Sequence, residues 1–330
     1  MNKIMFTILR ILDKHQKPVG STELAKELLS YGIDLSERTV RYYLKMLDEK
    51  GMTQVQGKKG RIITETGREE LNHAFVSERV NFIINKIDSL AYLTDFNLDT
   101  LKGNVILNIS FFPEKKIKEA FKIMTEVFTS RYAMGNRIKI AKGGERIGDI
   151  IIPKGCVGIG TICSITMNGI FLKAGIPVTS RYGGVLEIVD RNPSRFTALI
   201  SYEGSSIDPL EIFIKGRMTD VTGAVKSSSG KILASFREIP IVSLNEAEGL
   251  TEKMSAKGID GIIIFGKPNQ PLLDIPVGVD KVGMIIVGGL NPIAAVEESG
   301  IFTESMAMST LFEYSRLQGF NEAISSFLFQ

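Results

Sequence analysis

One stretch of this chain has a pattern of glycine, proline and asparagine that occurs again about 123 residues later. An internal repeat constrains a fold strongly, because each copy must form the same structural unit. The separation of the matching residues drifts only from 123 to 125, and the apolar segments around them match as well. These features favour a duplication; chance alignment of common residues is the alternative. The matches are Ile152-Pro153-Lys154-Gly155 with Ile275-Pro276-Val277-Gly278, Val157-Gly158 with Val282-Gly283, Asn168 with Asn291, and Gly175-Ile176 with Gly300-Ile301.

The composition is that of a globular protein with more than one domain. The 330 residues are 44% hydrophobic and 23% charged, which excludes a disordered chain and leaves room for two or three domains. No run reaches the roughly 18 unbroken apolar residues of a membrane span. The start of the sequence also lacks the apolar core of a signal peptide. We therefore expect a cytoplasmic protein with no membrane partner.

Cysteine and histidine usage argues against common metal and catalytic sites. Cys156 and Cys163 are seven residues apart, a spacing that matches no common zinc site, so we expect buried thiols. His15 and His73 both lie near the start, and the rest of the chain has no histidine. It therefore lacks the commonest general base and metal ligand. We expect no metal, no cofactor and no catalytic residue.

The first 75 residues differ from the rest in charge. They hold 13 Lys and Arg against 10 Asp and Glu, whereas the remainder is balanced. Apolar spacing and β-prone runs predict three helices, with Ser21 and Ser36 as the N-caps of the second and third, followed by two short strands. This order predicts a winged helix-turn-helix domain over residues 1–75. The predicted elements are 3–14, 21–29, 37–50, 53–56 and 61–64.

The third helix has a basic face and the hairpin has a basic tip. In a winged helix the third helix enters the DNA major groove, while the hairpin tip contacts phosphate or the minor groove. A solvated helix face is the alternative, but the order of elements favours DNA binding. Because one module is only mildly basic, we expect a homodimer on a palindrome in double-stranded operator DNA. The predicted DNA-binding residues are Arg38, Arg41, Tyr42, Lys45, Lys58, Lys59 and Arg61.

The rest of the chain predicts a connecting helix and then an α/β domain. Residues 76–100 are expected to connect the two domains, and a broad apolar stripe from Ser77 to Ala91 predicts a helix there. That helix packs on the next domain, pairs with its copy in a dimer, or does both.

Residues 101–325 predict an internally duplicated α/β (α+β) regulatory domain, with its copies at 101–190 and 236–325. Strand and helix patterns alternate within each copy. The expected strands are 104–110, 138–141, 196–202, 211–215, 232–238, 239–244 and 261–266, and the expected helices are 113–128, 170–174 and 245–257.

The repeated stretch contains a candidate ligand site. Asn168, followed by Gly169, is expected to cap the helix 170–174, and a helix N-terminus favours a carboxylate or phosphate. An ordinary helix cap without a ligand is the alternative. Arg181, next to Ser180, favours a carboxylate because a guanidinium binds carboxylates bidentately.

Other residues complete this prediction. Cys163 and Ser164 are expected to line the same site, and Lys142 and Arg146 are the next candidates for a carboxylate partner. The corresponding segment of the second copy, 303–307, has no arginine. Either one copy alone kept the acidic-ligand chemistry, or the two halves share one site at their interface.

At these motifs the chain resembles a known family, the archaeal nitrogen-assimilation repressors called NrpR. The resemblance covers residues 3–320. It implies a winged helix joined to one regulatory domain, and a repressor of nitrogen-fixation and ammonia-assimilation genes that 2-oxoglutarate releases from DNA. It leaves open whether a second family protein is required. The motifs are Cys163-Ser164-Ile165-Thr166-Met167-Asn168-Gly169, Pro177-Val178-Thr179-Ser180-Arg181-Tyr182-Gly183-Gly184 and Gly288-Gly289-Leu290-Asn291-Pro292.

Two other functions stay open at this point. An enzyme acting on a small carboxylic acid, with a winged helix for autoregulation, is one alternative. The absence of a Gly-Lys-Ser/Thr phosphate loop and of a Gly-x-Ser-x-Gly elbow argues against it. The other is a repressor whose second domain only mediates protein contacts.

Overall fold

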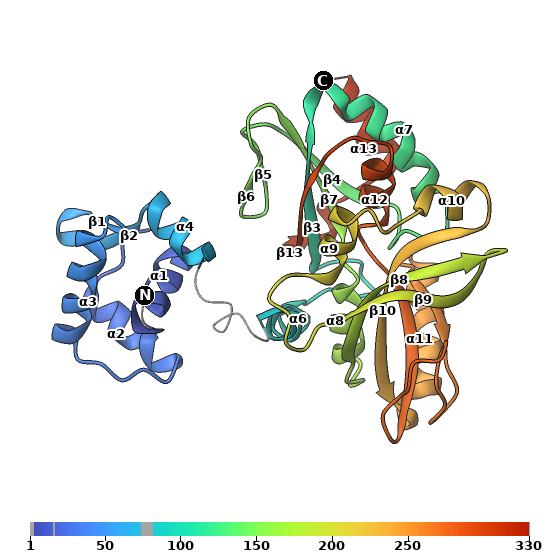
Figure 1. Cartoon of the computed structure of the whole chain (residues 1–330), viewed down its shortest axis with the longest axis horizontal. Coiled ribbons are helices and arrows are strands. Elements are labelled where there is room, and N and C mark those ends of the chain that lie inside the picture. Colours follow the sequence, from blue (N-terminus) through green and yellow to red (C-terminus); the bar gives the residue numbers. More distant parts are fainter. Residues whose placement is uncertain (1–2, 16, 74–81, 330) are drawn as a thin grey trace. The chain divides into compact units, whose positions relative to one another are not determined.

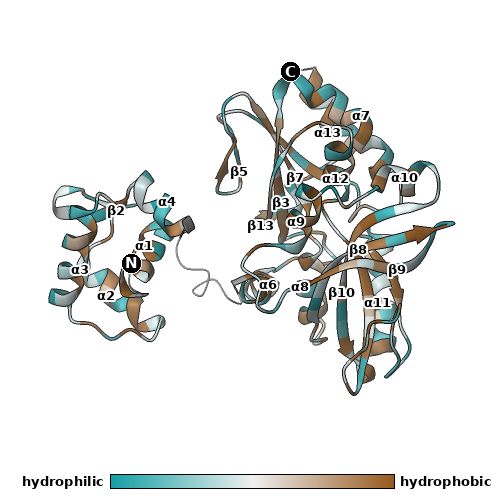
Figure 2. Cartoon of the chain, viewed as in Figure 1, coloured by the Kyte–Doolittle hydropathy of each residue, from teal (hydrophilic) through white to brown (hydrophobic). Residues whose placement is uncertain are grey.

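The computed structural model describes residues 3–15, 17–73 and 82–329, and the chain divides into two compact units, Met1–Val80 and Asn81–Gln330. Each unit has its own hydrophobic core, and hydrophobic residues, brown in Figure 2, run through both. The predicted connection, 76–100, is described only from α6 (Phe82–Leu93) onward (Figure 1). Residues 76–81 of that prediction lie outside the described residues.

The first unit has the predicted winged-helix architecture. Leucines such as Leu9, Leu24 and Leu44 are buried between its helices. The wing strands are antiparallel, with Thr53 opposite Ile63. Gly60, at the turn between them, has φ +118, and a Cβ there would lie 2.2 Å from the Val19 carbonyl oxygen, so only glycine fits. The elements are α1 (Lys3–His15), α2 (Ser21–Ser30), α3 (Glu37–Glu49), β1 (Thr53–Val55), η1 (Gly57–Lys59), β2 (Arg61–Ile63) and α4 (Glu65–His73).

One of the two predicted caps in this unit is confirmed and the other is wrong. Ser36 caps α3, because its side-chain oxygen accepts a hydrogen bond from the Thr39 backbone N–H at 3.2 Å. Ser21 is the first residue of α2, and Gly20 is the N-cap. The Ser21 hydroxyl donates instead to Glu37, at 2.9 Å, so it links α2 to α3.

The second unit contains two five-stranded antiparallel sheets and a small hairpin. The first sheet has the order β13-β3-β7-β4-β14 and the second β11-β12-β10-β8-β9. The strands are β3 (Asn104–Pro113), β4 (Arg137–Lys142), β5 (Arg146–Ile147), β6 (Ile150–Ile151), β7 (Cys156–Ile162), β8 (Thr179–Val189), β9 (Asn192–Ser201), β10 (Gly230–Pro240), β11 (Ile262–Phe265), β12 (Lys281–Val287), β13 (Glu304–Glu313) and β14 (Gln318–Gly319).

Helices connect these strands and pack against one another. The helix α7 packs against α12 and α13 (Figure 1), and α6 packs against α8. The helices that follow α6 are η2 (Glu114–Lys116), α7 (Ile117–Phe128), α8 (Ile165–Lys173), α9 (Pro209–Lys215), α10 (Val221–Lys226), η3 (Ile241–Ser243), α11 (Leu244–Ala256), α12 (Asn291–Glu298), η4 (Tyr314–Arg316) and α13 (Phe320–Leu328).

The same succession of elements occurs twice in the second unit. Leaving aside the hairpin β5–β6, which lies between β4 and β7, and the short 3-10 helices, it is β3-α7-β4-β7-α8-β8 in the first half and β10-α11-β11-β12-α12-β13 in the second. The last strand of each half pairs with the first strand of the other half, β8 with β10 and β13 with β3. The two halves are therefore interlocked, and neither completes its own sheet.

The predicted match between the two asparagines of the repeat is wrong. Asn291 accepts from the Leu233 backbone N–H at 2.8 Å, and in the first half Thr166 does the same for Ile106 at 3.0 Å. Thr166, rather than Asn168, is therefore the structural equivalent of Asn291. The shift from Thr166 to Asn291 is 125, as it is between glycines 175 and 300, which have φ +81 and +88.

Several predicted elements differ in type or limits. The predicted strand 211–215 belongs to the helix α9, because Asp208 caps it and Pro209 occupies its first turn. The predicted strands 232–238 and 239–244 are one strand, β10, which ends at Pro240 before η3. The helix predicted to begin at Pro113 begins at Ile117, since Pro113 ends β3 and η2 intervenes.

Candidate functional sites

The basic face predicted on the third helix lies on the surface of the first unit. Arg38, Arg41, Tyr42 and Lys45 are all exposed on α3. Tyr42 is 62% exposed and makes an edge contact with Tyr43, with ring centroids 5.8 Å apart. Four exposed side chains on one helix face are what a recognition helix requires.

Acidic residues on the same helix lie beside two of these basic side chains. Arg41 forms an ion pair with Glu37 of the preceding turn, and its Nε donates to the Ser21 hydroxyl at 3.2 Å. Lys45 lies 3.9 Å from Glu49. Arg38 has no such neighbour among the described residues, so it is the most available cation on α3.

The wing residues divide into two groups. Lys59 is exposed at the tip, and the side chain of Lys58 lies outside the described residues. Arg61 is only 23% exposed, and its Nε donates to Asp48 at 2.8 Å. The same aspartate accepts from the Thr53 hydroxyl at 2.6 Å. Arg61 therefore holds the wing to α3, and the structure does not place it on the exposed basic surface.

A cavity of about 380 Å³ lies where the second unit was predicted to bind a ligand. Of the six predicted ligand residues only Ser180 and Arg181 line it, whereas Cys163, Ser164, Asn168 and Gly169 are buried and are not part of its wall. The lining residues are Ile84, Asn85, Thr179, Ser180, Arg181, Tyr182, Ser201 and Glu203.

Arg181 reaches this cavity because the sheet is irregular at that point. Phe236 lies opposite Tyr182 and Arg237 opposite Ser180, so Arg181 is the extra residue of a β-bulge. Bulges often redirect a side chain next to a functional site. Arg181 is 40% exposed and lies 3.3 Å from the carboxylate of Glu238, which is 2% exposed. A ligand carboxylate at Arg181 has to share the guanidinium with Glu238.

Behind the cavity lies a buried arginine, Arg237, which the sequence analysis did not single out. Its NH1 donates to the Ser164 carbonyl oxygen at 2.9 Å and to Asn168 Oδ1, and its NH2 donates to Ser164 Oγ at 2.6 Å. Asn168 Nδ2 in turn donates to Ser180 Oγ at 3.0 Å. A chain of hydrogen bonds therefore runs from the cavity wall to a fully buried cation.

Asn168 and Gly169 have structural roles that differ from the predicted ones. The helix α8 begins at Ile165 with Ser164 as N-cap, so both residues lie inside it and the predicted cap at Asn168 is wrong. A Cβ on Gly169 would lie 2.7 Å from Thr94 Cβ and 3.0 Å from the Ala91 carbonyl oxygen. Gly169 therefore allows α6 to pack closely on α8.

Cys163 is buried, and burial raises the pKa of its thiol to about 11. A thiol with such a pKa is almost entirely protonated at neutral pH, and the thiolate is the nucleophilic form. The position of Cys163 therefore suits packing and argues against nucleophilic catalysis.

A second group of charges lies between α6, α9 and β13, in which Asp208 is buried and Lys86 and Glu211 are half-buried. Lys86 Nζ donates to the Ala307 carbonyl oxygen at 3.2 Å, and burial lowers the pKa of Lys86. Burial raises the pKa of the Asp208 carboxyl to about 6 and also raises that of Glu211. Asp208 accepts from the Leu210 N–H at 2.8 Å and so caps α9. These groups fix α6, which lines the cavity, to the body of the unit.

The remaining candidates lie elsewhere. Lys142 is near the ring of Phe327, at 5.6 Å, and Arg146 is exposed on the hairpin β5–β6. Neither lines the cavity beside Arg181.

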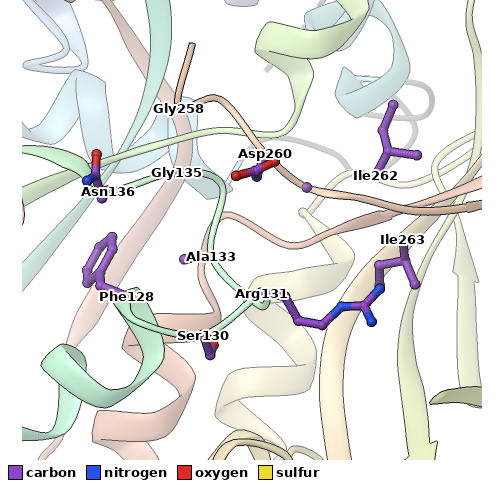
Figure 3. Close-up of a pocket in the computed structure, with 11 residues that line it drawn as sticks. Phe128, Ser130, Arg131, Ala133, Gly135, Asn136, Gly258, Asp260, Ile262 and Ile263 are labelled. Carbon is purple, nitrogen blue, oxygen red and sulfur yellow. The ribbon is translucent and has the colours of Figure 1, made fainter. Parts of the chain in front are cut away.

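Another cavity, of about 450 Å³, lies between the loops that follow α7 and α11, with Arg131 and Asp260 on its wall (Figure 3). It contains none of the predicted site residues.

Histidine does appear next to carboxylates in the first unit. One ligand atom each from His15, Glu23 and Glu27 lie within 4.8 Å of one another. His15 Nε2 and the Glu27 carboxylate are hydrogen-bonded, which accounts for the proximity of these two residues.

Comparison with known proteins decides the family. The sequence profile of the NrpR regulatory domains NRD1 and 2 matches residues 80–319, and that of the ribonuclease R winged-helix domain matches residues 6–71. The global nitrogen regulator NrpRI of Methanosarcina mazei is 37% identical over 314 residues, which cover 95% of this chain and 97% of that protein. The chain belongs to the NrpR family.

Other members of the NrpR family differ in length. The global nitrogen regulators NrpR of Methanococcus maripaludis and Methanocaldococcus jannaschii are each 34% identical, over 96% of this chain. The match spans only 56% and 55% of their respective lengths. A solved structure of a nitrogen repressor-like protein from Methanococcus jannaschii aligns with a TM-score of 0.60 and 31% identity, over 72% of this chain and 97% of that one. This match supports the mixed α/β fold.

Among the described residues, no helix combines the length and apolar character that a membrane crossing requires.

Proposed function

We propose that the chain is a DNA-binding transcriptional repressor of nitrogen-fixation and nitrogen-assimilation genes, and that 2-oxoglutarate releases it from its operator. One observation carries the proposal: a winged helix with an exposed basic α3 precedes, in one chain, a regulatory domain of the NrpR family. Relatives that match nearly the whole chain are named global nitrogen regulators.

The DNA-binding half of the proposal rests on α3 and the wing tip. Arg38, Arg41 and Lys45 lie along one exposed helix face, and Lys59 is exposed on the wing. A winged helix with so few cations makes few phosphate contacts, and contacts with phosphate supply a large share of the affinity for DNA. We propose that two chains bind a palindrome as a homodimer, each through its own winged helix.

The effector half rests on the cavity lined by Ser180 and Arg181. A small dicarboxylate suits it, since a guanidinium at a β-bulge and a serine hydroxyl can bind one carboxylate together. Glu203 and Glu238 lie close by. Both carboxylates repel an anion. The ligand carboxylate must therefore bind Arg181 more strongly than Glu238 does.

The helix α6 is the element through which we propose that the ligand acts. It contributes Ile84 and Asn85 to the cavity wall. Among the described elements, α6 is the first one after α4, the last helix of the first unit. Lys86 and the close contact at Gly169 fix the same helix to β13 and α8. A ligand that moves α6 therefore acts on the segment of chain that leads to the winged helix.

Binding, rather than catalysis, is the function that we propose for the second unit. The raised thiol pKa of Cys163 disfavours it as a nucleophile, and residues 76–330 contain no histidine. A turnover assay with 2-oxoglutarate should therefore leave the compound unchanged.

Isothermal titration of the full chain tests the effector half directly. We expect 2-oxoglutarate to bind the wild-type protein, and Arg181→Ala to weaken that binding at least about tenfold, since a charged hydrogen-bonding partner is lost. A wild-type protein that binds no 2-oxoglutarate, with or without operator DNA and with or without a second family protein, contradicts the proposal.

A further inference from the structure

Among the residues that the structure describes, Arg237 is a buried charge without a counter-ion at contact distance. It is 0% exposed, and the hydrogen bonds found for it go to neutral oxygens of Ser164 and Asn168. None of the ion pairs among the described residues includes it. A buried cation that lacks an anion is strongly destabilising unless something compensates its charge.

The same side chain has an unused donor. Among the described residues, Arg237 Nε and Ser235 Oγ are the two buried side-chain polar atoms without a hydrogen-bond partner. Residues two apart on a strand point to the same face, so both donors lie on one face of β10. Buried polar groups are almost always paired. Two unpaired donors on one face of the strand therefore indicate a place for an acceptor.

The surroundings suit an anion rather than a cation. Ser164 is the N-cap of α8, and the N-terminus of a helix carries partial positive charge. Opposite Ser235 on β8 lies Gly183, where a Cβ would meet Pro209 Cβ at 2.8 Å and Tyr202 Oη at 3.1 Å, so the side chains of Pro209 and Tyr202 lie close to this position. The buried carboxylate of Asp208 acts on Arg237 electrostatically, but burial is the larger influence and lowers the Arg237 pKa.

We infer that Arg237, Ser235 and Ser164 form a buried subsite for a carboxylate of the effector, behind the cavity lined by Ser180 and Arg181. The inference rests on the proposed function. Ser180 connects the two places, because it lines the cavity and accepts the hydrogen bond of Asn168. A dicarboxylate then places one carboxylate at Arg181 and, once the contact between Ser180 and Asn168 opens, the other at Arg237.

Titration calorimetry with 2-oxoglutarate and the full chain tests this subsite. Ser235→Ala removes one proposed donor without adding volume, and we expect a roughly tenfold weaker affinity, the usual effect of losing a hydrogen bond to a charged group. Arg237→Lys keeps the charge but removes Nε, and it should weaken binding at least as much. Ser110→Ala is the matched control, because Ser110 is a buried strand serine of the other sheet, bonded to Ser305 at 2.9 Å.

Thermal unfolding without ligand separates binding from folding. Ser235→Ala should be at least as stable as the wild type, since it removes an unpaired hydroxyl. If Ser235→Ala and Arg237→Lys bind 2-oxoglutarate as tightly as the wild type, a buried water or no partner occupies the place, and the inference is wrong. An equal loss in Ser110→Ala also overturns it. A wild-type protein that binds no 2-oxoglutarate instead refutes the proposed function itself.

Discussion

Arg41 and Lys59 should affect DNA binding in different ways, because they lie on different parts of the winged helix. Arg41→Ala should weaken binding to the operator by about 1–3 kcal/mol if its guanidinium reads a base edge. Lys59→Ala should weaken binding to all DNA alike and flatten the dependence of affinity on salt. Fluorescence anisotropy with operator and scrambled duplexes at several salt concentrations measures both effects. If Arg41→Ala lost the same affinity for both duplexes, Arg41 would contact phosphate rather than a base edge.

The two thiols should differ in reactivity at neutral pH. Cys163 is buried with its pKa raised to about 11, whereas Cys156 is half-buried. Because the thiolate is the reactive form, iodoacetamide should label Cys156 first in the native protein, as followed by mass spectrometry of peptides. Labelling of Cys163 should accelerate up to about pH 11, as long as the fold persists. Labelling of Cys163 ahead of Cys156 at pH 7 would mean that the cavity opens to it.

At the scale of residues, exposed positions were easier to predict than buried ones. The basic face of α3 follows from helical spacing alone, and Arg38, Arg41 and Lys45 are exposed as that spacing requires. The partner of Arg61 is Asp48, which depends on how the wing folds back on α3. Arg237 had one signal, an arginine inside the largely apolar segment 232–239, but a strand pattern does not reveal that both faces of β10 are buried.

Among the helices, the contact between α6 and α8 depends on one glycine. Alanine favours a helix interior over glycine by up to about 1 kcal/mol, but at Gly169 its Cβ would meet Thr94 at 2.7 Å. We expect Gly169→Ala to lower the free energy of unfolding by about 1–3 kcal/mol, the usual cost of overpacking. Gly249→Ala on α11 is the control, because it has nothing within 4 Å and should stabilise. Chemical denaturation measures both, and a stabilised Gly169→Ala would contradict this packing.

The cap of α9 should make stability depend on pH. The Asp208 pKa is about 6 in the folded state, above its ordinary 3.8. The folded state therefore binds the proton more tightly than the unfolded state does. The contribution of this proton to the free energy of unfolding is fully present below pH 4 and is lost as the pH rises through 6. The difference between these two pKa values corresponds to about 3 kcal/mol of stability. Asp208→Asn keeps a side-chain oxygen as cap and stays neutral. Relative to wild type, its free energy of unfolding should rise between pH 4 and 7, and a flat difference would refute the raised pKa.

Errors in the predicted elements arose where local patterns were ambiguous. The segment 211–215 has a short apolar run that suits a strand or a helix, and the helical signal is Asp208 followed by Pro209. The start of α8 was placed too late, because Asn168 is a common cap residue. Its amide instead bonds to Arg237, a residue 69 positions away. Contacts so distant in sequence leave no trace in local periodicity.

For the whole molecule, the sequence revealed the repeat but not how its halves interlock. Equivalent glycines, prolines and flanking strands recur because each half folds into the same succession of elements. The exchange of β8 and β13 between the halves is set by long-range pairing, so the succession of elements does not specify it. The cavity depends on this exchange, since its arginine lies on β8 and the buried Arg237 on β10.

Release of operator DNA by 2-oxoglutarate tests the central claim most directly. Ligand and DNA each weaken the binding of the other by the same coupling free energy, which is typically about 1–3 kcal/mol. Anisotropy of labelled operator should therefore show weaker binding as 2-oxoglutarate is added, and operator should weaken 2-oxoglutarate binding by the same factor. Arg181→Ala should bind operator like the wild type, yet respond only at higher ligand concentration. Operator affinity that stays constant at saturating 2-oxoglutarate would contradict the account.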